Sequence, residues 1–250
     1  MVHEIDDLMK INKKLFIIVF LLLPISLSLF AEQLTFLCSN FSPKDEVYAR
    51  SQSIVDSFFQ KYHNFFHITP FPTQQQDHHE LCFFNPDIFN ADSISFHQKV
   101  IASNIQAEDS LFYNLIPYKP VLIDSISIIF ISITTPDFPV LYKKYSKDIF
   151  IEPAIFEQTK ILCDVFKRFG FDHIIAINYL GDYLSKELLL KVSDLDLVID
   201  YFSLDNTHHY MQEISHPKLI NWDRRKEHFL LIKVTSEKDE LFIKEVVEME

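Results

Sequence analysis

Two pairs of adjacent histidines, His78-His79 and His208-His209, are the side chains best suited by type to bind a metal ion. Each pair has an aspartate nearby in the sequence. Neighbouring side chains on an extended segment point to opposite faces, so each pair offers only one ligand comfortably. A metal site would therefore need both loops to meet over the edge of a sheet. We interpret the four histidines as solvated loop residues, with a displaced metal site as the alternative.

The spacing of cysteine and glycine gives no support to several other kinds of site. Cys38, Cys82 and Cys163 are an odd number without C-x-x-C spacing, which supports neither a disulfide framework nor a zinc ribbon. Gly170 and Gly181 are the only glycines, so neither a P-loop nor a G-x-G-x-x-G loop can be written. The G-x-S-x-G elbow of many serine hydrolases is missing too. We therefore predict no cofactor.

The excess of acidic over basic residues argues against one class of partner, nucleic acids. The chain has 35 acidic and 23 basic residues, a formal net charge of -12. Its lysines and arginines form no basic stripe, so we expect no nucleic-acid partner. With 48% hydrophobic residues over 250 positions, the chain can bury a sizeable core and is not a disordered polymer.

Apolar runs alternate with amphipathic helices along the chain, a pattern that predicts one α/β domain. Strands are expected at residues 34–38, 65–69, 80–84, 99–103, 121–124, 127–133, 173–177, 196–199, 229–234 and 241–247. Helices are expected after an N-cap at Ser42, at 153–169 and at 183–192. The second helix should end at Gly170. It should bury a face made of Ile155, Leu162, Val165, Phe166 and Phe169.

The first 31 residues have the layout of a secretory signal peptide. Two lysines precede an uncharged run at 15–31, which contains Pro24 and is shorter than the roughly 20 apolar residues of a membrane-spanning helix. Acidic residues before Met9 point to that methionine as the true start. We expect cleavage after Ala31 and export to a bacterial periplasm. The alternative is an uncleaved segment that anchors the protein in the inner membrane.

Three stretches of the sequence resemble the metallophosphoesterase (calcineurin-like) domain of secreted bacterial 5′-nucleotidases. They are Lys99-Val-Ile-Ala-Ser-Asn104 with Ile116-Pro-Tyr118 and residues 128–137, then residues 172–181, then residues 196–204. The resemblance covers about residues 34–247, the catalytic domain alone. It implies a four-layer α/β/β/α sandwich with a single domain over residues 32–250. It leaves no room for the C-terminal nucleotide-recognition domain of that family.

The resemblance also implies two metal ions, which in that family bind phosphate and activate water. Its T-N-D-x-H motif aligns with residues 39–43, which puts Phe41 and Pro43 at the Asp and the His. Its G-N-H-E motif aligns with residues 84–87, which keeps Asn85 but puts Pro86 at the His.

The remaining motifs of the family are altered as well. The bridging carboxylate of its G-D motif should follow the strand at 65–69, where Pro70-Phe71 stands instead. The histidine of its S-H motif aligns with Tyr179, and the two of its G-H-x-H motif align with Phe202 and Leu204. Phe, Pro and Leu cannot ligate a divalent cation, and Tyr does so rarely.

We therefore interpret these positions as vestigial and predict no catalytic, metal-binding or cofactor-binding residue. We expect an aromatic filling of the former cleft by Phe41, Phe84, Phe202 and Leu204. The interpretation is an exported pseudoenzyme that serves as a binding or structural module. Its partner would be a periplasmic or envelope protein or a small apolar ligand. The alternative is an active phosphoesterase or nucleotidase, a phosphoric ester hydrolase with an unconventional metal site.

Processing of the N-terminus gives the first testable prediction. Intact-mass analysis of the protein isolated from its native cells should give the mass of a chain that begins at Glu32, because cleavage is expected after Ala31. A mass that still includes residues 15–31 would contradict cleavage and indicate the membrane-anchored alternative.

Overall fold

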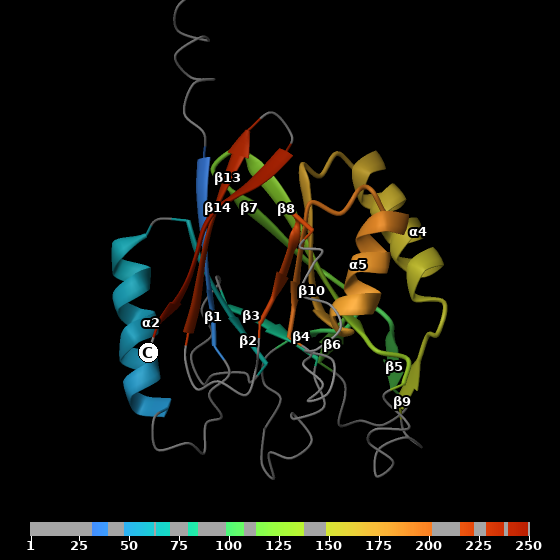
Figure 1. Cartoon of the computed structure of the whole chain (residues 1–250), viewed down its shortest axis with the longest axis horizontal. Helices are drawn as coiled ribbons and strands as arrows, with labels where there is room; N and C mark the ends of the chain where they lie inside the picture. Colours follow the sequence, from blue (N-terminus) through green and yellow to red (C-terminus); the bar gives the residue numbers. More distant parts are fainter. Residues whose placement is uncertain are drawn as a thin grey trace, which may run out of the picture. The chain divides into compact units, whose positions relative to one another are not determined.

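Two β-sheets packed face to face form the centre of the fold, shown in a computed structural model (Figure 1). The structure describes residues 32–39, 48–62, 64–70, 80–84, 99–107, 114–137, 149–201, 216–222, 229–237 and 240–249. From Gln33 onwards the chain forms one compact unit. The expected signal peptide, residues 1–31, lies outside the described part.

The larger sheet has seven strands in the order β14-β13-β1-β2-β3-β4-β6. They are β1 (Glu32–Cys38), β2 (Phe65–Thr69), β3 (Glu80–Phe83), β4 (Val100–Ile101), β6 (Leu115–Ile116), β13 (Phe229–Glu237) and β14 (Glu240–Met249). Strands β1, β2, β3, β4 and β6 run parallel, whereas β13 and β14 form an antiparallel hairpin. The expected hairpin at the end of the chain is confirmed.

The smaller sheet has five strands in the order β12-β11-β10-β8-β7. They are β7 (Lys119–Ile123), β8 (Ile126–Thr134), β10 (His173–Tyr179), β11 (Leu197–Asp200) and β12 (Leu219–Asn221). Within this sheet, β7 pairs with β8 as the expected antiparallel hairpin, and the other pairings are parallel. A separate antiparallel pair consists of β5 (Ile105–Ala107) and β9 (Ile149–Ile151).

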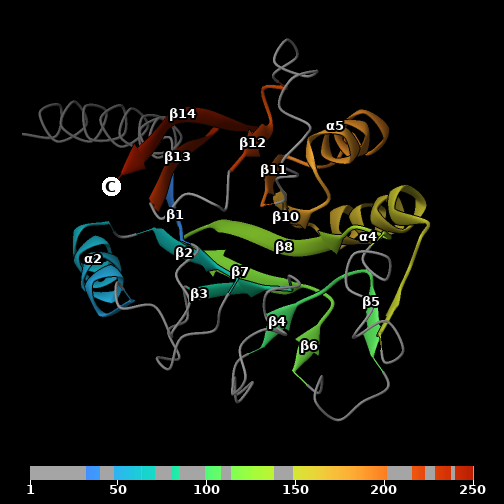
Figure 2. The same cartoon turned by 60° about the horizontal axis from the view of Figure 1, so that its bottom comes forward.

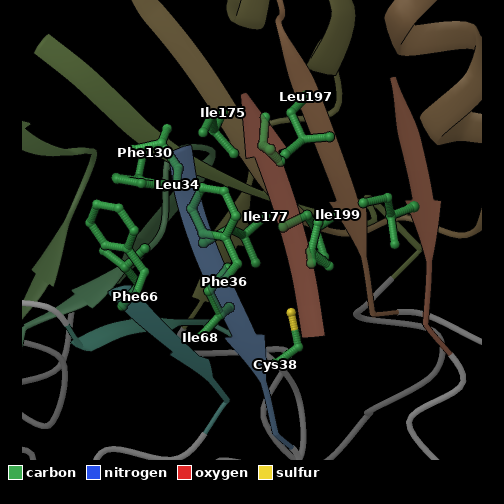
Figure 3. Packing of buried hydrophobic residues seen from close by; sticks show 14 of the residues in the cluster. Leu34, Phe36, Cys38, Phe66, Ile68, Phe130, Ile175, Ile177, Leu197 and Ile199 are labelled. Atoms are coloured by element: carbon green, nitrogen blue, oxygen red, sulfur yellow. The ribbon is translucent and has the colours of Figure 1, made fainter. Parts of the chain in front are cut away.

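Alternate side chains of the central strands meet between the two sheets. Phe36 of β1 stacks on Phe66 of β2, with ring centroids 5.3 Å apart, and meets the edge of Phe130 of β8 at 6.3 Å. Leu34 and Ile177 belong to the same buried cluster (Figure 3). Because side chains alternate along a strand, this register commits every second residue of each strand to the inter-sheet core.

Helices cover the outer faces of both sheets (Figure 2). Helix α2 (Tyr48–Lys61) contributes Val55, Phe58 and Phe59 to a cluster with Leu37 and Phe65 on the outer face of the larger sheet. Helices α4 (Ile155–Arg168) and α5 (Asp182–Lys191) pack on the outer face of the smaller sheet. The four-layer α/β/β/α arrangement predicted from the sequence is confirmed.

The predicted buried face of α4 is partly wrong. Ile155 and Phe166 are buried as expected, but Val165 is 38% exposed and Phe169 is 78% exposed. The buried stripe instead runs Ile155, Thr159, Cys163 and Phe166. Thr159 can lie on this stripe because its hydroxyl donates a hydrogen bond to the carbonyl of Ile155 at 2.6 Å, which satisfies the polar atom inside the helix layer.

Helix α4 ends at a glycine, as its sequence predicts. Gly170 has φ of +82°, and its N–H donates to the carbonyl of Lys167 at 3.0 Å. The next N–H, from Phe171, donates to the carbonyl of Phe166 at 3.2 Å, and the two rings meet edge to face. These paired hydrogen bonds with their apolar contact are a Schellman motif.

No helix within the described ranges is long and apolar enough to cross a bilayer.

The turn at Gly170 gives a prediction for stability. Nothing lies within 4 Å of a Cβ built at Gly170, so Gly170→Ala should cause no clash with other residues. The only cost should be that of holding alanine in the left-handed backbone conformation, which lowers the free energy of unfolding by about 1 kcal/mol. Gly170→Asn is the matched control and should lose less, because Asn tolerates this conformation better. Urea unfolding of the three proteins measures both values, and equal losses for Ala and Asn would contradict the backbone explanation.

Candidate functional site

The parallel strands of both sheets end at one edge, which we term the carboxyl edge and define by Cys38, Thr69, Thr134, Tyr179 and Asp200. Ligands of parallel α/β sheets usually bind where strands end in this way. The family resemblance places its metal ligands at the same ends. The carboxyl edge is therefore where a functional site is expected.

Backbone-directed hydrogen bonds join the two sheets at this edge. The Asn104 side chain donates from Nδ2 to the carbonyl of Thr134 at 2.8 Å and accepts at Oδ1 from the Thr134 N–H at 2.9 Å. Just before it, the Ser103 N–H donates to the carbonyl of Ser132 at 2.8 Å, and the Ser103 hydroxyl oxygen accepts from the Ser132 N–H at 2.9 Å. These four hydrogen bonds fix the end of β4 against β8.

Aromatic side chains fill the inter-sheet space beside this joint. Tyr201, directly after β11, lies 4.4 Å from the ring of Phe83 and 4.8 Å from that of Trp222. Its hydroxyl donates to the carbonyl of Ile68 in the opposite sheet at 3.3 Å. Tyr179 belongs to the same buried cluster and is 1% exposed. We refer to Phe83, Tyr179, Tyr201 and Trp222 as the aromatic plug.

The ionisable groups near the plug are held neutral. Burial raises the pKa of the Cys38 thiol to about 12, and a hydrogen bond with Tyr201 offsets only part of that rise. Burial, followed by the nearby Cys38 thiol, also raises the pKa of Tyr201 well above its usual range. At pH 7 both groups are therefore a neutral thiol and a neutral phenol.

A buried histidine lies near the same edge but on the other face of the larger sheet. His67 places Nε2 at 2.7 Å from the Ser39 hydroxyl. Burial lowers the pKa of His67 to about 4, which keeps the imidazole neutral near pH 7. The residues beside it along β2, Phe66 and Ile68, face the inter-sheet core, so His67 points away from that core.

The acidic groups at the end of the smaller sheet hold α5 in place. Asn178 and Asp200 are register partners on β10 and β11. The Ser185 hydroxyl donates to Asp200, and Asn178 Nδ2 donates to that hydroxyl at 3.4 Å. Within α5, Lys186 donates to Asp182 at 2.6 Å. Among the described residues, no group of three His, Cys, Asp or Glu side chains is arranged to hold a metal ion.

One of the seven positions interpreted as vestigial falls in the described part of the chain. Tyr179, which the sequence resemblance aligns with the family's S-H histidine, is buried in the plug. The other six lie outside the described residues: Phe41, Pro43, Asn85, Pro86, Phe202 and Leu204. The histidine pairs His78-His79 and His208-His209 lie outside them too.

The expected role of Phe84 in filling the cleft is wrong. Phe84 is buried with Val100 and Ile149 in a separate cluster. The preceding residue, Phe83, faces the inter-sheet core instead. The strand expected at 80–84 is confirmed over Glu80–Phe83. The filling role of Phe84 rests on the motif alignment, which does not take account of the alternation of faces along β3. Trp222, which follows the three-residue strand β12, was missed because so short a strand leaves little periodic signal.

Comparison with known proteins identifies the architecture. No protein-family model and no curated protein matches the chain. Among solved structures, the NAD nucleotidase NadN of Haemophilus influenzae superposes with a TM-score of 0.61 at 14% identity, covering 87% of this chain and 50% of that one. The calcineurin-like phosphoesterase YfkN of Bacillus subtilis gives 0.60 at 12% identity, covering 88% and 90%. The chain has the calcineurin-like metallophosphoesterase fold.

A third similar structure extends the comparison. The 5′-nucleotidase precursor of Thermus thermophilus superposes with a TM-score of 0.60 at 16% identity, covering 87% of this chain and 55% of that one. The chain thus spans about half the length of the NadN and Thermus proteins. The predicted metallophosphoesterase-like domain is confirmed at the level of the fold.

Titration of His67 gives a prediction for pH dependence. The pKa of His67 in the folded protein is about 4, below the usual 6.5. The contribution of the neutral imidazole to the free energy of unfolding is therefore fully present above pH 6.5 and is lost as the pH falls toward 4. The imidazole should therefore lower the free energy of unfolding by about 2 kcal/mol between pH 7.5 and pH 5.0. Denaturant unfolding at both pH values should show this excess loss in the wild type relative to His67→Gln. The same pH dependence in both proteins would show that His67 is not buried.

Proposed function

We propose that the protein is an exported, metallophosphoesterase-like pseudoenzyme that acts as a binding or structural module in the periplasm. Its partner would be an envelope protein or a small apolar ligand, and retention of the N-terminal segment would tether it to the membrane. The observation that carries the proposal is the burial of Tyr179, which is 1% exposed inside the aromatic plug. The sequence resemblance aligns this residue with a metal-binding histidine.

The side chains at the carboxyl edge differ from those that two-metal phosphoester hydrolysis needs. Two-metal sites need several carboxylate, imidazole or amide ligands facing a shared, hydrated space. At the carboxyl edge, the inter-sheet cluster is aromatic and apolar, and Cys38 is held as a neutral thiol. The polar side chains on that face of β8, Ser132 and Thr134, carry neutral hydroxyls. The described part of the edge does not fit a two-metal centre, so we derive no catalytic step through one.

The scaffold itself is retained, which supports a role in binding or structure. Asn104 and Ser103 still join the sheets at the carboxyl edge, and the rings of the plug pack against one another there. A well-packed edge whose described part offers no set of metal ligands is what we expect when the fold is kept for its surface and not for its reaction.

Metal binding and hydrolysis test the proposal together. Purified full-length protein, incubated with Mn²⁺ and Zn²⁺ and passed through gel filtration, should retain less than one metal ion per chain by elemental analysis. It should not hydrolyse p-nitrophenyl phosphate or AMP above the rate of the buffer. The YfkN phosphoesterase, treated in the same way, serves as the positive control.

Retention of two metal ions per chain would contradict the proposal and indicate the active alternative. The four histidines at 78, 79, 208 and 209 would then be replaced by alanine in pairs. Loss of metal in either double variant would locate the displaced site.

A further inference from the structure

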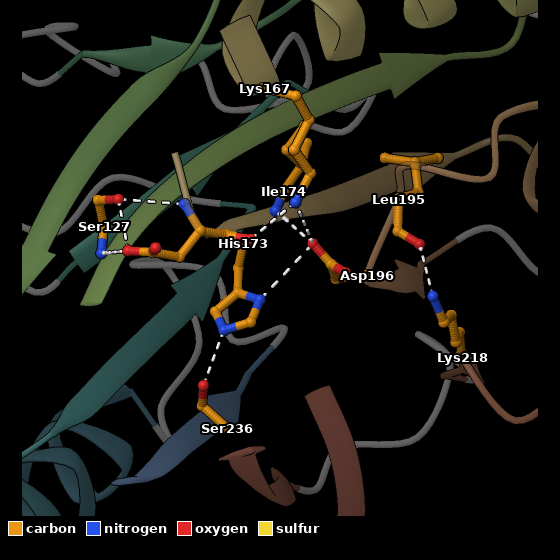
Figure 4. A network of polar contacts seen from close by, with 9 residues as sticks. Ser127, Lys167, His173, Ile174, Leu195, Asp196, Lys218 and Ser236 are labelled. Atoms are coloured by element: carbon orange, nitrogen blue, oxygen red, sulfur yellow. Dashed lines mark hydrogen bonds and ion pairs between the residues drawn. The ribbon is translucent and has the colours of Figure 1, made fainter. Parts of the chain in front are cut away.

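A serine, a histidine and an aspartate from three separate segments converge at the opposite edge of the smaller sheet (Figure 4). His173 is the first residue of β10, and Asp196 directly precedes β11, so both lie where strands begin. Ser236 comes from β13 of the larger sheet. The His173 Nε2 atom is 2.8 Å from the Ser236 hydroxyl oxygen, and Nδ1 is 3.6 Å from Asp196 Oδ2.

The neighbouring carboxylate determines which way these hydrogen bonds run. If Nδ1 were unprotonated, its lone pair would face Asp196 Oδ2, and the two would repel each other. The neutral ring therefore carries its proton on Nδ1, which leaves Nε2 as an acceptor. The Ser236 hydroxyl then donates to Nε2. This is the direction that a general base needs in order to take the proton of a serine nucleophile.

Asp196 is fixed in position by groups other than the imidazole. Its Oδ2 accepts the Ile174 N–H at 2.9 Å and lies 3.5 Å from Lys167 Nζ. Lys167 is itself anchored, because it donates to the carbonyl of Asp172 at 2.7 Å. The 3.6 Å separation from Nδ1 is longer than a hydrogen bond, as such contacts often are in the absence of substrate.

The three side chains differ in how deeply they are buried. His173 is 1% exposed and Asp196 is 7% exposed, whereas Ser236 is half-buried next to the exposed Glu237. The base and the acid are thus shielded from water, and Ser236 is the most exposed of the three residues.

We propose that Ser236, His173 and Asp196 form a nucleophilic site that accepts an acyl group from small neutral carboxylic esters. The Ser236 oxygen forms a bond to the ester carbonyl carbon while its proton passes to His173 Nε2. The bond from that carbon to the alkoxy oxygen breaks, and the departing oxygen takes the proton from Nε2. Water then enters by the reverse sequence and releases the carboxylic acid, which restores the serine.

Charge favours a neutral ester over a phosphate ester at this site. Asp196, behind the imidazole, is paired with Lys167 at 3.5 Å, and Glu237, next along β13, is paired with Lys244 at 3.5 Å. Among the described residues, the site therefore offers no unpaired cation to an anionic group, and the net charge of -12 over the whole chain disfavours an anionic substrate. Asp196 acts through the imidazole and is a positioning residue, whereas Ser236 and His173 exchange the proton. The site shares no residue with the carboxyl edge, so it stands or falls independently of the proposed function.

Acetylation by p-nitrophenyl acetate tests the site in the full-length protein. Peptide mapping by mass spectrometry after brief exposure should find the acetyl group on Ser236, and Ser236→Ala should lose that adduct. Ser125→Ala is the matched control, since Ser125 is an exposed serine at the turn between β7 and β8, and it should leave the labelling of Ser236 unchanged. His173→Gln should slow the labelling by about 100-fold, the usual contribution of a general base.

The pH profile keeps the test decisive if the His173 variant does not fold. In the wild type, the rate of acetylation at Ser236 should rise through one titration and then level off, because only the neutral imidazole accepts a proton. Asp196→Asn should slow the labelling of Ser236 and leave that of Ser125 unchanged, because the carboxylate no longer holds the proton of the imidazole on Nδ1. Labelling of Ser236 no faster than that of Ser125, or a rate that climbs with pH without a plateau, would overturn the proposal.

Discussion

Burial of alternate side chains between two facing sheets is the constraint on which the rest of this structure depends. Phe36, Phe66 and Phe130 interlock at the centre of that space, and truncation of one such ring to alanine typically costs about 3–5 kcal/mol. Because a strand offers only two faces, the residues that fill the inter-sheet core also decide which residues face the helices. The orientation of His67, away from the inter-sheet core, follows from that division.

At the carboxyl edge, the same packing continues to the strand ends. The aromatic plug brings residues of both sheets into contact there, and Tyr201 reaches across to the carbonyl of Ile68. Two polar side chains of that edge point outward: His67 faces away from the inter-sheet core, and Asp200 accepts a hydrogen bond from the hydroxyl of Ser185 in α5. The hydroxyls of Ser132 and Thr134 are buried on the inter-sheet face of β8. The edge thus keeps the joints of a metallophosphoesterase-like fold, and aromatic rings fill its inter-sheet space.

Much of this arrangement was predictable from the sequence, and the exceptions have physical reasons. Long apolar runs such as β8 and the hairpin of β13 and β14 have a hydrophobic pattern that is clear enough to predict them, and Gly170 marks the end of α4. Strands of two or three residues, such as β5 and β12, are too short to show such a pattern. The cleft-filling role expected for Phe84 is wrong because a motif alignment does not take account of the alternation of side chains along a strand. Phe83 and Phe84 are adjacent and therefore face opposite sides of the sheet. Contacts between distant segments, such as Ser236 with His173, depend on how the two sheets are stacked, which no local pattern reveals.

Trp222 offers the most direct test of the closed carboxyl edge, because it is the only tryptophan in the chain and lies 4.8 Å from Tyr201 in the plug. Its indole N–H resonance would be followed by NMR while Mn²⁺ is added to the full-length protein. A paramagnetic ion bound at the carboxyl edge would broaden that resonance at one or two equivalents, and Mg²⁺ serves as the diamagnetic control. The account predicts an unchanged line width, and selective broadening of Trp222 would contradict it.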